Sequence, residues 1–183
     1  IVERVFRVLF LALTMTLSSL ALANEPNEER FDSLLKLDDT AHAIEKAKIM
    51  LASSSLAPTE EVMAYPTLAK LYHANSQPKQ ALSSAHKALK LAQDFDLGEL
   101  EAHASKYVGI LYFFRNDISV AMKHYQHSLD YFRQTNQHLE QAHVLNNMAL
   151  ANTAIHQFES AVKEFELAAE IYRNEGNTID SID

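Results

Sequence analysis

The chain has no cysteine and no tryptophan, and its 183 residues include only three glycines and four prolines. Without cysteine the protein has neither disulfides nor thiolate ligands for a metal ion. The sequence also lacks a glycine-rich phosphate-binding loop, a Gly-x-Ser-x-Gly turn and a His-Glu-x-x-His pair. We therefore expect no catalytic residues and no cofactor in this segment. The scarcity of helix-breaking residues, together with abundant alanine and leucine, predicts an all-α protein.

Positive charge is scarce as well, because 16 lysines and arginines face 24 aspartates and glutamates, for a net charge of −8. Nucleic-acid binding relies on clustered basic residues, and no such run is present, so we expect no nucleic-acid partner. Four glutamates mark one predicted helix near the end of the chain, where a charged outer face explains them better than acid–base chemistry. These residues are Glu159, Glu164, Glu166 and Glu170.

The first 23 residues have the three parts of a secretory signal peptide. Arg4 and Arg7 precede an uncharged run over residues 8–23, which ends in the small-x-small sequence Ala21-Leu22-Ala23. This run is shorter than the roughly 20 apolar residues that span a bilayer. The pattern predicts a cleaved signal peptide rather than a retained anchor, and therefore export to the periplasm.

The remaining chain contains an internal repeat with a period of about 40 residues, which lies in the range of solenoid arrays. Small residues recur at Ala69, Gly109 and Ala149, and alanines recur at positions 81, 121 and 161, without any gap in the alignment. A fixed period of this size predicts a solenoid, in which each unit packs on its neighbours. The predicted units are residues 24–61 as a degenerate helix pair, residues 62–101, 102–141 and 142–181 as three repeats, and residues 182–183 as the start of a further, truncated repeat.

The order of residues within each unit resembles the tetratricopeptide repeat. Leu68-Ala69-x-x-Tyr72 and Val108-Gly109-x-x-Tyr112 match the large–small–x–x–aromatic pattern of the first helix in that family. The long period and the sequence Leu145-Asn146-Asn147-Met148-Ala149 are similar to the kinesin-light-chain variety. The resemblance implies a right-handed α-solenoid of antiparallel helix pairs. Three departures are the missing Trp at the start of each unit, the missing Pro at its end, and Asn152 in an aromatic position.

Hydrophobic periodicity and turn residues place the helices. The predicted ranges are 28–37, 41–53, 60–74, 78–93, 98–115, 118–134, 138–154 and 157–174. We expect Thr59 or a neighbour to cap its helix, Pro66 to kink that helix or delay its start, and Gly176 to adopt a left-handed helix end. In the first pair, the inward residues are predicted to be Phe31, Leu34, Leu35 and Leu37, packed against Ala43, Ile44, Ala47 and Leu51.

In such arrays the first helix of each pair lines a concave groove, and its residues that do not pack inward face a partner. The predicted groove residues are Lys70, His73, His103, Lys106, Ile110, Phe113, His143, Asn146 and Leu150, with Met63, Phe114 and Thr153 beside them. The Asn146 amide suits a peptide backbone, and Lys106 suits a carboxylate. The expected partner is therefore a peptide or protein segment.

Nine histidines raise the question of a metal site. His124 and His127 lie three residues apart on one predicted helix, and His103 and His143 lie one period apart. Neither pair has a third ligand at zinc-like spacing, so no metal is predicted.

Two functions remain open. The first is an exported helical-repeat scaffold that binds a peptide or protein segment in its groove. The alternative is the periplasmic sensory region of a membrane signalling enzyme, a diguanylate cyclase or histidine kinase. Contact with a membrane is expected only through the signal peptide or a span beyond residue 183, and the sequence does not predict an oligomeric state.

Overall fold

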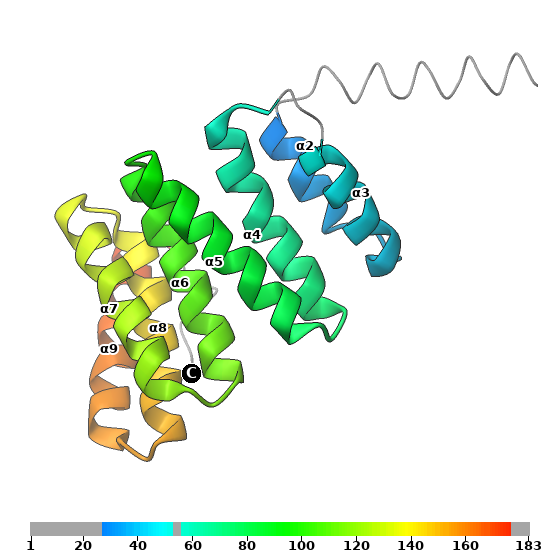
Figure 1. Ribbon diagram of the computed structural model, residues 1–183. Helices are drawn as coiled ribbons and strands as arrows, with labels where there is room; N and C mark the ends of the chain where they lie inside the picture. The colour runs from blue at the N-terminus through cyan, green and yellow to red at the C-terminus, as the bar shows by residue number, and fades with distance from the viewer. Residues whose placement is uncertain (1–26, 53–55, 177–183) are drawn as a thin grey trace, which may run out of the picture.

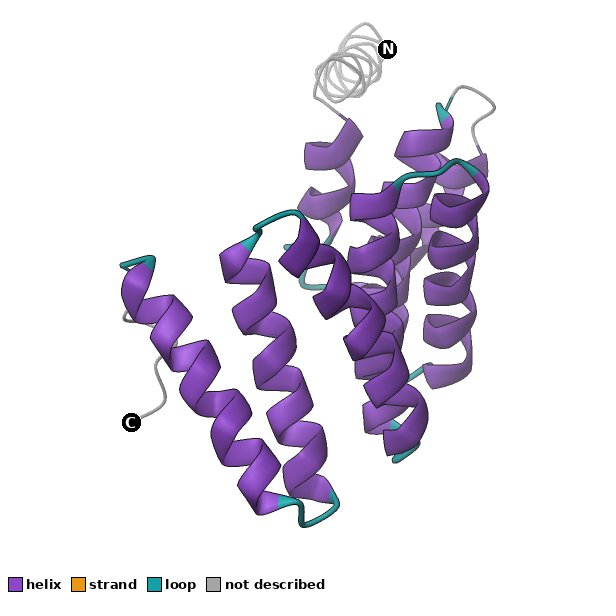
Figure 2. Ribbon diagram, turned by 90° about the vertical axis from the view of Figure 1, so that its left-hand side faces the viewer, coloured by secondary structure: helices purple, strands orange, loops and turns teal. Residues whose placement is uncertain are grey.

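The structure is a computed structural model, and it describes residues 27–52 and 56–176. These residues form eight helices and no strand (Figure 1, Figure 2). The helices are α2 (Asn27–Leu34), α3 (Thr40–Ala52), α4 (Pro58–Ala74), α5 (Pro78–Asp94), α6 (Gly98–Phe114), α7 (Ile118–Gln134), α8 (His138–Ala154) and α9 (Phe158–Asn174). The predicted signal peptide and residues 182–183 lie outside the described residues.

The helices pack as consecutive antiparallel pairs. Helix α4 packs against α5, α6 against α7, and α8 against α9, while α5 also contacts α6 and α7 contacts α8. The first helices of the pairs meet as well, because α4 contacts α6 and α6 contacts α8. We call α4, α6 and α8 the inner helices. The predicted all-α solenoid of antiparallel helix pairs is therefore confirmed.

The backbone geometry of α4 to α9 repeats once for each helix with its connection. The length of this unit is half the period of the sequence repeat. Helices α4 to α9 each contain 17 residues, and three-residue connections separate them. In each connection, and again after α9, the second residue lies in the left-handed region of backbone conformation. These residues are Ser76, Asp96, Asn116, Asn136 and His156, with φ between 54° and 63°, and Gly176, with φ of 76°. The predicted left-handed helix end at Gly176 is confirmed.

The hydrogen bonds at the first of these connections explain why it is so short. The amide of Gln77 donates to the Tyr72 carbonyl at 2.8 Å, and the amide of Ser76 donates to the His73 carbonyl at 3.0 Å. This pair of bonds closes a helix on a left-handed residue. The carbonyl of Gln77 then accepts from the Ala81 amide, which starts the next helix. A short connection therefore both ends one helix and begins another.

Gly109 allows α6 to approach α7 closely. A Cβ atom at Gly109 would lie 2.6 Å from Tyr125 Cε1 and 3.2 Å from the Ala121 carbonyl oxygen. Tyr125 is fully buried in the core between the helix pairs. The large ring of Tyr125 therefore requires the absence of a side chain at Gly109.

Asn152 stands where the repeat pattern has an aromatic residue, and its contacts explain how the fold accommodates it. Its side chain is buried, and Nδ2 donates to Glu164 Oε2 at 2.8 Å. The corresponding pair one unit earlier is Tyr112 and His124, whose rings stack with centroids 5.8 Å apart. A hydrogen bond thus replaces a ring contact at the same junction. It also corrects our interpretation of Glu164, which is partly buried, whereas Glu166 and Glu170 are exposed.

Several local predictions at the N-terminal end are wrong. Phe31 and Leu34 are buried as expected, but α2 ends at Leu34, and Leu35 and Leu37 remain 39% and 37% exposed. They lie in the turn after the helix and therefore leave its apolar face.

The start of α4 also differs from expectation. The helix begins at Pro58, so Pro66 lies inside it and does not delay its start, and Thr59 is already helical. The carboxylate of Glu60, three residues after Ala57, accepts from the Ala57 amide at 2.7 Å. Glu60 rather than Thr59 therefore satisfies the donor at this helix end.

We expect Gly109→Ala to destabilise the protein, because the new methyl group must displace Tyr125. Overpacking typically costs about 1–3 kcal/mol, against a gain of about 1 kcal/mol from replacing a helical glycine. In a Tyr125→Ala background the same substitution should cost less, because only the Ala121 carbonyl oxygen, at 3.2 Å, remains close to the new methyl group. Urea denaturation of the wild type, the two single variants and the double variant measures both values, and an equal effect in the two backgrounds would contradict the close approach.

Ser76→Gly should raise the free energy of unfolding by about 1 kcal/mol, because glycine adopts the left-handed conformation without the penalty of a side chain. Ser83→Gly is the matched control. Ser83 is an exposed residue inside α5, where glycine should cost about 0.5–1 kcal/mol. Thermal and urea unfolding would refute the assignment of Ser76 if both glycine variants were destabilised.

Candidate functional site

The predicted groove residues all lie on the inner helices α4, α6 and α8. Most of them are partly buried, as expected for side chains at the rim of a packed seam. The partly buried residues are Met63, His73, His103, Lys106, Ile110, Phe113, His143 and Asn146, and the exposed residues are Lys70, Phe114, Leu150 and Thr153. Their role in binding stays a prediction, but the structure shows which of them come together.

Four polar side chains meet between α6 and α8. Lys106 Nζ forms an ion pair with Glu140 Oε2, and the same oxygen lies 3.8 Å from His103 Nδ1 and 3.7 Å from His143 Nδ1. His103 and Lys106 come from α6, whereas Glu140 and His143 come from α8. We call these four residues the Glu140 cluster. His103, Lys106 and His143 were among the predicted groove residues, and the structure brings them together around Glu140, which was not.

The buried ring of Phe132 forms the apolar side of this cluster. Lys106 Nζ lies 5.7 Å from the centroid of the ring, and the His103 ring lies 5.0 Å from it. The Lys106 cation is attracted by the electrons of the aromatic ring, whereas the His103 ring meets Phe132 edge-on. Phe132 belongs to α7, so the cluster depends on three consecutive helices.

The cluster holds Glu140 strongly in its charged form. The imidazole of His143 and the ammonium group of Lys106 lower the pKa of Glu140 to about 2. Burial lowers the pKa of His103, and the charge of Lys106 lowers it further, while Glu140 acts in the opposite direction. A carboxylate and an ammonium group are thus the stable charges of the site at neutral pH.

Sequence reasoning missed Glu140. It is the third residue of α8, as Glu60 is the third residue of α4, and this position usually signals a helix cap. Glu60 does cap its own helix, whereas Glu140 reaches α6 instead. The available signal was its spacing of three residues from His143, which places the two side chains on one face of the helix.

Apolar side chains gather toward the other end of α6. Phe114 is 64% exposed, and its ring lies 5.6 Å from that of Phe113 and 4.8 Å from that of His73 on α4. Leu150 is 43% exposed on α8, at the position that Ile110 occupies on α6. The inner helices α6 and α8 are therefore polar in their first halves and apolar toward their C-terminal ends.

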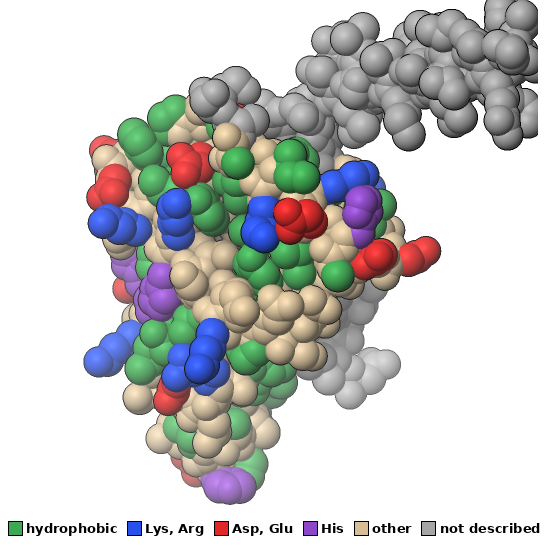
Figure 3. All heavy atoms as spheres, turned by 45° about the vertical axis from the view of Figure 1, so that its right-hand side comes forward, with side chains coloured by type: hydrophobic (Ala, Val, Ile, Leu, Met, Phe, Trp, Pro, Cys, Tyr) green, Lys and Arg blue, Asp and Glu red, His purple; other side chains and the backbone are tan. Residues whose placement is uncertain are grey.

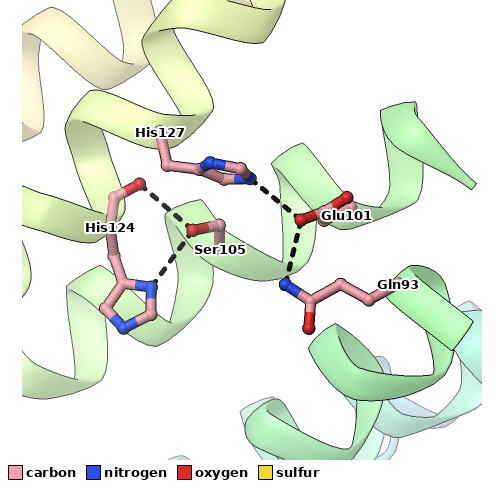
Figure 4. Close-up of polar contacts among 5 residues, drawn as sticks. All are labelled: Gln93, Glu101, Ser105, His124 and His127. Carbon is pink, nitrogen blue, oxygen red and sulfur yellow. Dashed lines mark hydrogen bonds and ion pairs between the residues drawn. The ribbon is translucent and has the colours of Figure 1, made fainter.

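A second polar network joins α5, α6 and α7, and Figure 4 shows its members. Gln93 Nε2 donates to Glu101 Oε1 at 3.0 Å, and His127 Nε2 lies 3.0 Å from the same oxygen. Ser105 Oγ donates to the carbonyl of His124 at 3.2 Å, and His124 Nδ1 lies 3.1 Å from that Oγ. These bonds tie neighbouring helices together.

The two histidine pairs that the sequence suggested have different partners in the structure. His124 is bonded to Ser105 and His127 to Glu101, while His103 and His143 share Glu140. Within residues 27–52 and 56–176, no three histidine or carboxylate side chains are placed to hold a metal ion. His103, His124 and His127 contact polar partners on another helix, whereas His143 contacts Glu140 on its own helix α8.

Charge is mixed on the face drawn in Figure 3, where basic, acidic and histidine side chains lie between hydrophobic areas. This face offers no uniformly basic area of the kind that binds a phosphate backbone. In the described part of the chain, no helix is both long and apolar enough to cross a bilayer.

Comparison with known proteins identifies the family. Residues 35–180 match the family model of the soluble NSF attachment protein, SNAP. The chain belongs to this family. No curated protein matches the SNAP-family chain significantly.

Three solved structures illustrate what this SNAP-family chain is similar to. BtubC (BKLC) from P. vanneervenii is 20% identical with a TM-score of 0.71, over 84% of this chain and 63% of that chain. The apo form of RapI is 14% identical with a TM-score of 0.75, over 88% and 63%. A putative kinesin light chain from Podosopora anserina with TPR-like repeats is 15% identical with a TM-score of 0.67, over 81% and 74%.

These likenesses concern the fold alone, because no identity among them exceeds 20%. The predicted tetratricopeptide-like fold is confirmed, including its similarity to a kinesin light chain. The SNAP-family chain spans about 63% of the length of BtubC and of RapI.

We expect Glu140→Gln to lower the free energy of unfolding at pH 7 by about 1–3 kcal/mol, because it leaves the Lys106 cation without its counter-charge. The difference from wild type should shrink as the pH falls from about 4.5 toward 2, where wild-type Glu140 itself becomes protonated. A low folded-state pKa means that this stabilisation is present above the unfolded pKa and is lost in acid.

The control for this variant is Glu175→Gln, which removes a carboxylate 3.0 Å from His138 in a well-exposed pair. Such surface pairs contribute about 0–1 kcal/mol, so this variant should stay close to wild type. Urea denaturation at several pH values provides the measurement. Equal losses in the two variants would show that the Glu140 cluster contributes nothing special to stability.

Proposed function

We propose that this chain is an interaction scaffold whose inner helices α4, α6 and α8 bind a peptide or protein segment. The observation that carries the proposal is the exposure of Phe114 and Leu150 on these helices, at 64% and 43%. Large apolar side chains that a fold leaves uncovered next to polar groups favour a protein-binding surface. The scaffold fold without catalytic motifs supports the same conclusion.

The arrangement along α6 favours an amphipathic partner segment. Phe114 follows His103 by eleven positions, which is about 16 Å at the rise of an α-helix. A segment lying across the inner helices would therefore contact the Glu140 cluster on one side and Phe114 on the other. An α-helix is about 10–12 Å wide and fits within this distance.

Asn146 is well placed for a polar contact to the same segment. It is partly buried on α8, one turn after His143, and it makes no side-chain hydrogen bond to other described residues. An amide has both a donor and an acceptor and can hold the carbonyl and the amide of a peptide backbone. Asn146 is accordingly part of the proposed binding surface.

Export to the periplasm belongs to this proposal and rests on the signal-peptide pattern of residues 1–23. The same pattern also supports the second candidate, in which the repeats form the sensory region of a membrane-bound diguanylate cyclase or histidine kinase. The coding sequence that follows residue 183 separates the two candidates, because the second requires a membrane span and a catalytic domain.

We expect the double substitution Phe114→Ser and Leu150→Ser to weaken partner binding at least thirtyfold, which corresponds to the loss of an anchor of about 2 kcal/mol. The partner is first captured from a periplasmic extract with the wild-type protein, and its affinity for each variant is then measured by calorimetry. The matched control is Ile49→Ser and Val162→Ser, which removes two exposed apolar side chains from the second helices α3 and α9. Unchanged affinity in the first variant, or equal loss in both, would contradict the proposal.

A further inference from the structure

We propose that His103, Lys106 and His143 form a carboxylate-binding site, and that Glu140 occupies it as an internal substitute for a carboxylate of the partner segment. The inference rests on the proposed function and names the chemistry that the polar half of the groove recognises. The partner would supply either a C-terminal carboxylate or an Asp or Glu side chain.

The geometry is that of a carboxylate oxygen with three nitrogen atoms around it: Lys106 Nζ is within hydrogen-bond distance, and the two imidazole nitrogens lie 3.7–3.8 Å away. A single oxygen, Glu140 Oε2, has all three contacts, and these come from two different helices. Lys106 carries a full positive charge, and both histidines add charge when they are protonated. The Lys106 charge balances one carboxylate, so the site holds either Glu140 or a carboxylate that displaces it. Such a site accepts any carboxylate that reaches the position of Oε2.

The cluster is accessible from the surface of the inner helices. The side chains of Lys106 and Glu140 are 17% and 26% exposed, and those of His103 and His143 are 37% and 44% exposed. The site is therefore partly shielded, which strengthens charge interactions, yet open to an incoming group. The cluster lies on the inner helices, which form the surface that the proposed partner contacts.

The repeat itself does not require this cluster. One unit earlier, between α4 and α6, the positions of His103, Lys106 and Glu140 hold Met63, Pro66 and Leu100. Those helices pack without any charged group at these places. The cluster is thus an addition at one point of the array rather than part of the common packing scheme.

Glu140 also has a favourable place to go when it is displaced. It lies in the first turn of α8, where free backbone amides and the helix dipole stabilise a carboxylate. Unlike the Ala57 amide that Glu60 binds at α4, the Gln137 amide before α8 already donates to the Phe132 carbonyl at 2.9 Å, so a displaced Glu140 turns toward the first-turn amides and water. An incoming carboxylate therefore exchanges with Glu140 without leaving it unsolvated.

Chemical rescue tests the site without any knowledge of the partner. We expect sodium acetate to raise the melting temperature of Glu140→Ala by about 2–4 °C more than equal concentrations of acetamide or sodium chloride do. Wild type should gain less, because Glu140 fills the site. The double variant Glu140→Ala and Lys106→Met should show no acetate-specific gain, and neither should Glu175→Ala, whose carboxylate has His138 as its partner.

Should Glu140→Ala fail to fold, Glu140→Gln replaces it: the Gln side chain lacks the charge that pairs with Lys106, so acetate displaces it more easily than it displaces Glu140. Acetate binding to that variant is then followed through the imidazole NMR signals of His103 and His143. The proposal predicts saturable shifts of both histidines with acetate and none with acetamide. It is overturned if acetate behaves like acetamide, or if the double variant responds as strongly as the single one.

Peptides distinguish the two sources of the carboxylate. Short peptides with a free C-terminus are compared with amidated ones, and peptides with internal Glu with those containing Gln, against Glu140→Gln. Loss of the preferred carboxylate should weaken binding at least tenfold, and equal affinity across all four sets overturns the proposal. The Phe114 and Leu150 variants test the proposed function separately, since acetate rescue does not depend on the apolar half of the groove.

Discussion

The left-handed residue that closes each helix from α4 to α9 is the constraint on which the remaining structure depends. It recurs at one fixed interval from Ser76 to Gly176, and it fixes both the length of the helices and the direction in which each new helix leaves. Because the connections are equal, α4, α6 and α8 present equivalent positions in the same register. That register brings His103 and Lys106 of one unit next to Glu140 and His143 of the following one.

Side-chain size at the helix crossings then determines how closely the pairs pack. Gly109 admits the ring of Tyr125, and the Asn152–Glu164 hydrogen bond replaces an aromatic contact in the next pair. The pair Asn152–Glu164 thus fills the same place as Tyr112–His124 with different chemistry, while the helix lengths and connections stay the same. The inner helices are left with a polar half around Glu140 and an apolar half around Phe114, and this division defines the chemistry of the proposed binding surface.

Much of the fold could be predicted from the sequence because it depends on local and periodic signals. The recurring small residues at Ala69, Gly109 and Ala149 predict the helix pairs, and Gly176 predicts a left-handed turn. The sequence did not reveal that the backbone repeats at half the sequence period, because Ser76, Asp96 and His156 share no residue type that signals a left-handed turn. Glu140 was missed for a different reason: its partner Lys106 lies on another helix, far away in the sequence, and no local pattern shows which neighbour a carboxylate will choose.

Site-specific photo-crosslinking tests most directly whether the inner helices form the binding surface. A photoreactive amino acid replaces Leu150 on the inner helix α8 or, for comparison, Lys123, an exposed residue on the second helix α7. With the captured partner bound, crosslinks from position 150 and none from position 123 are the predicted result. Crosslinks from position 123 alone would contradict the account and place the partner on the second helices.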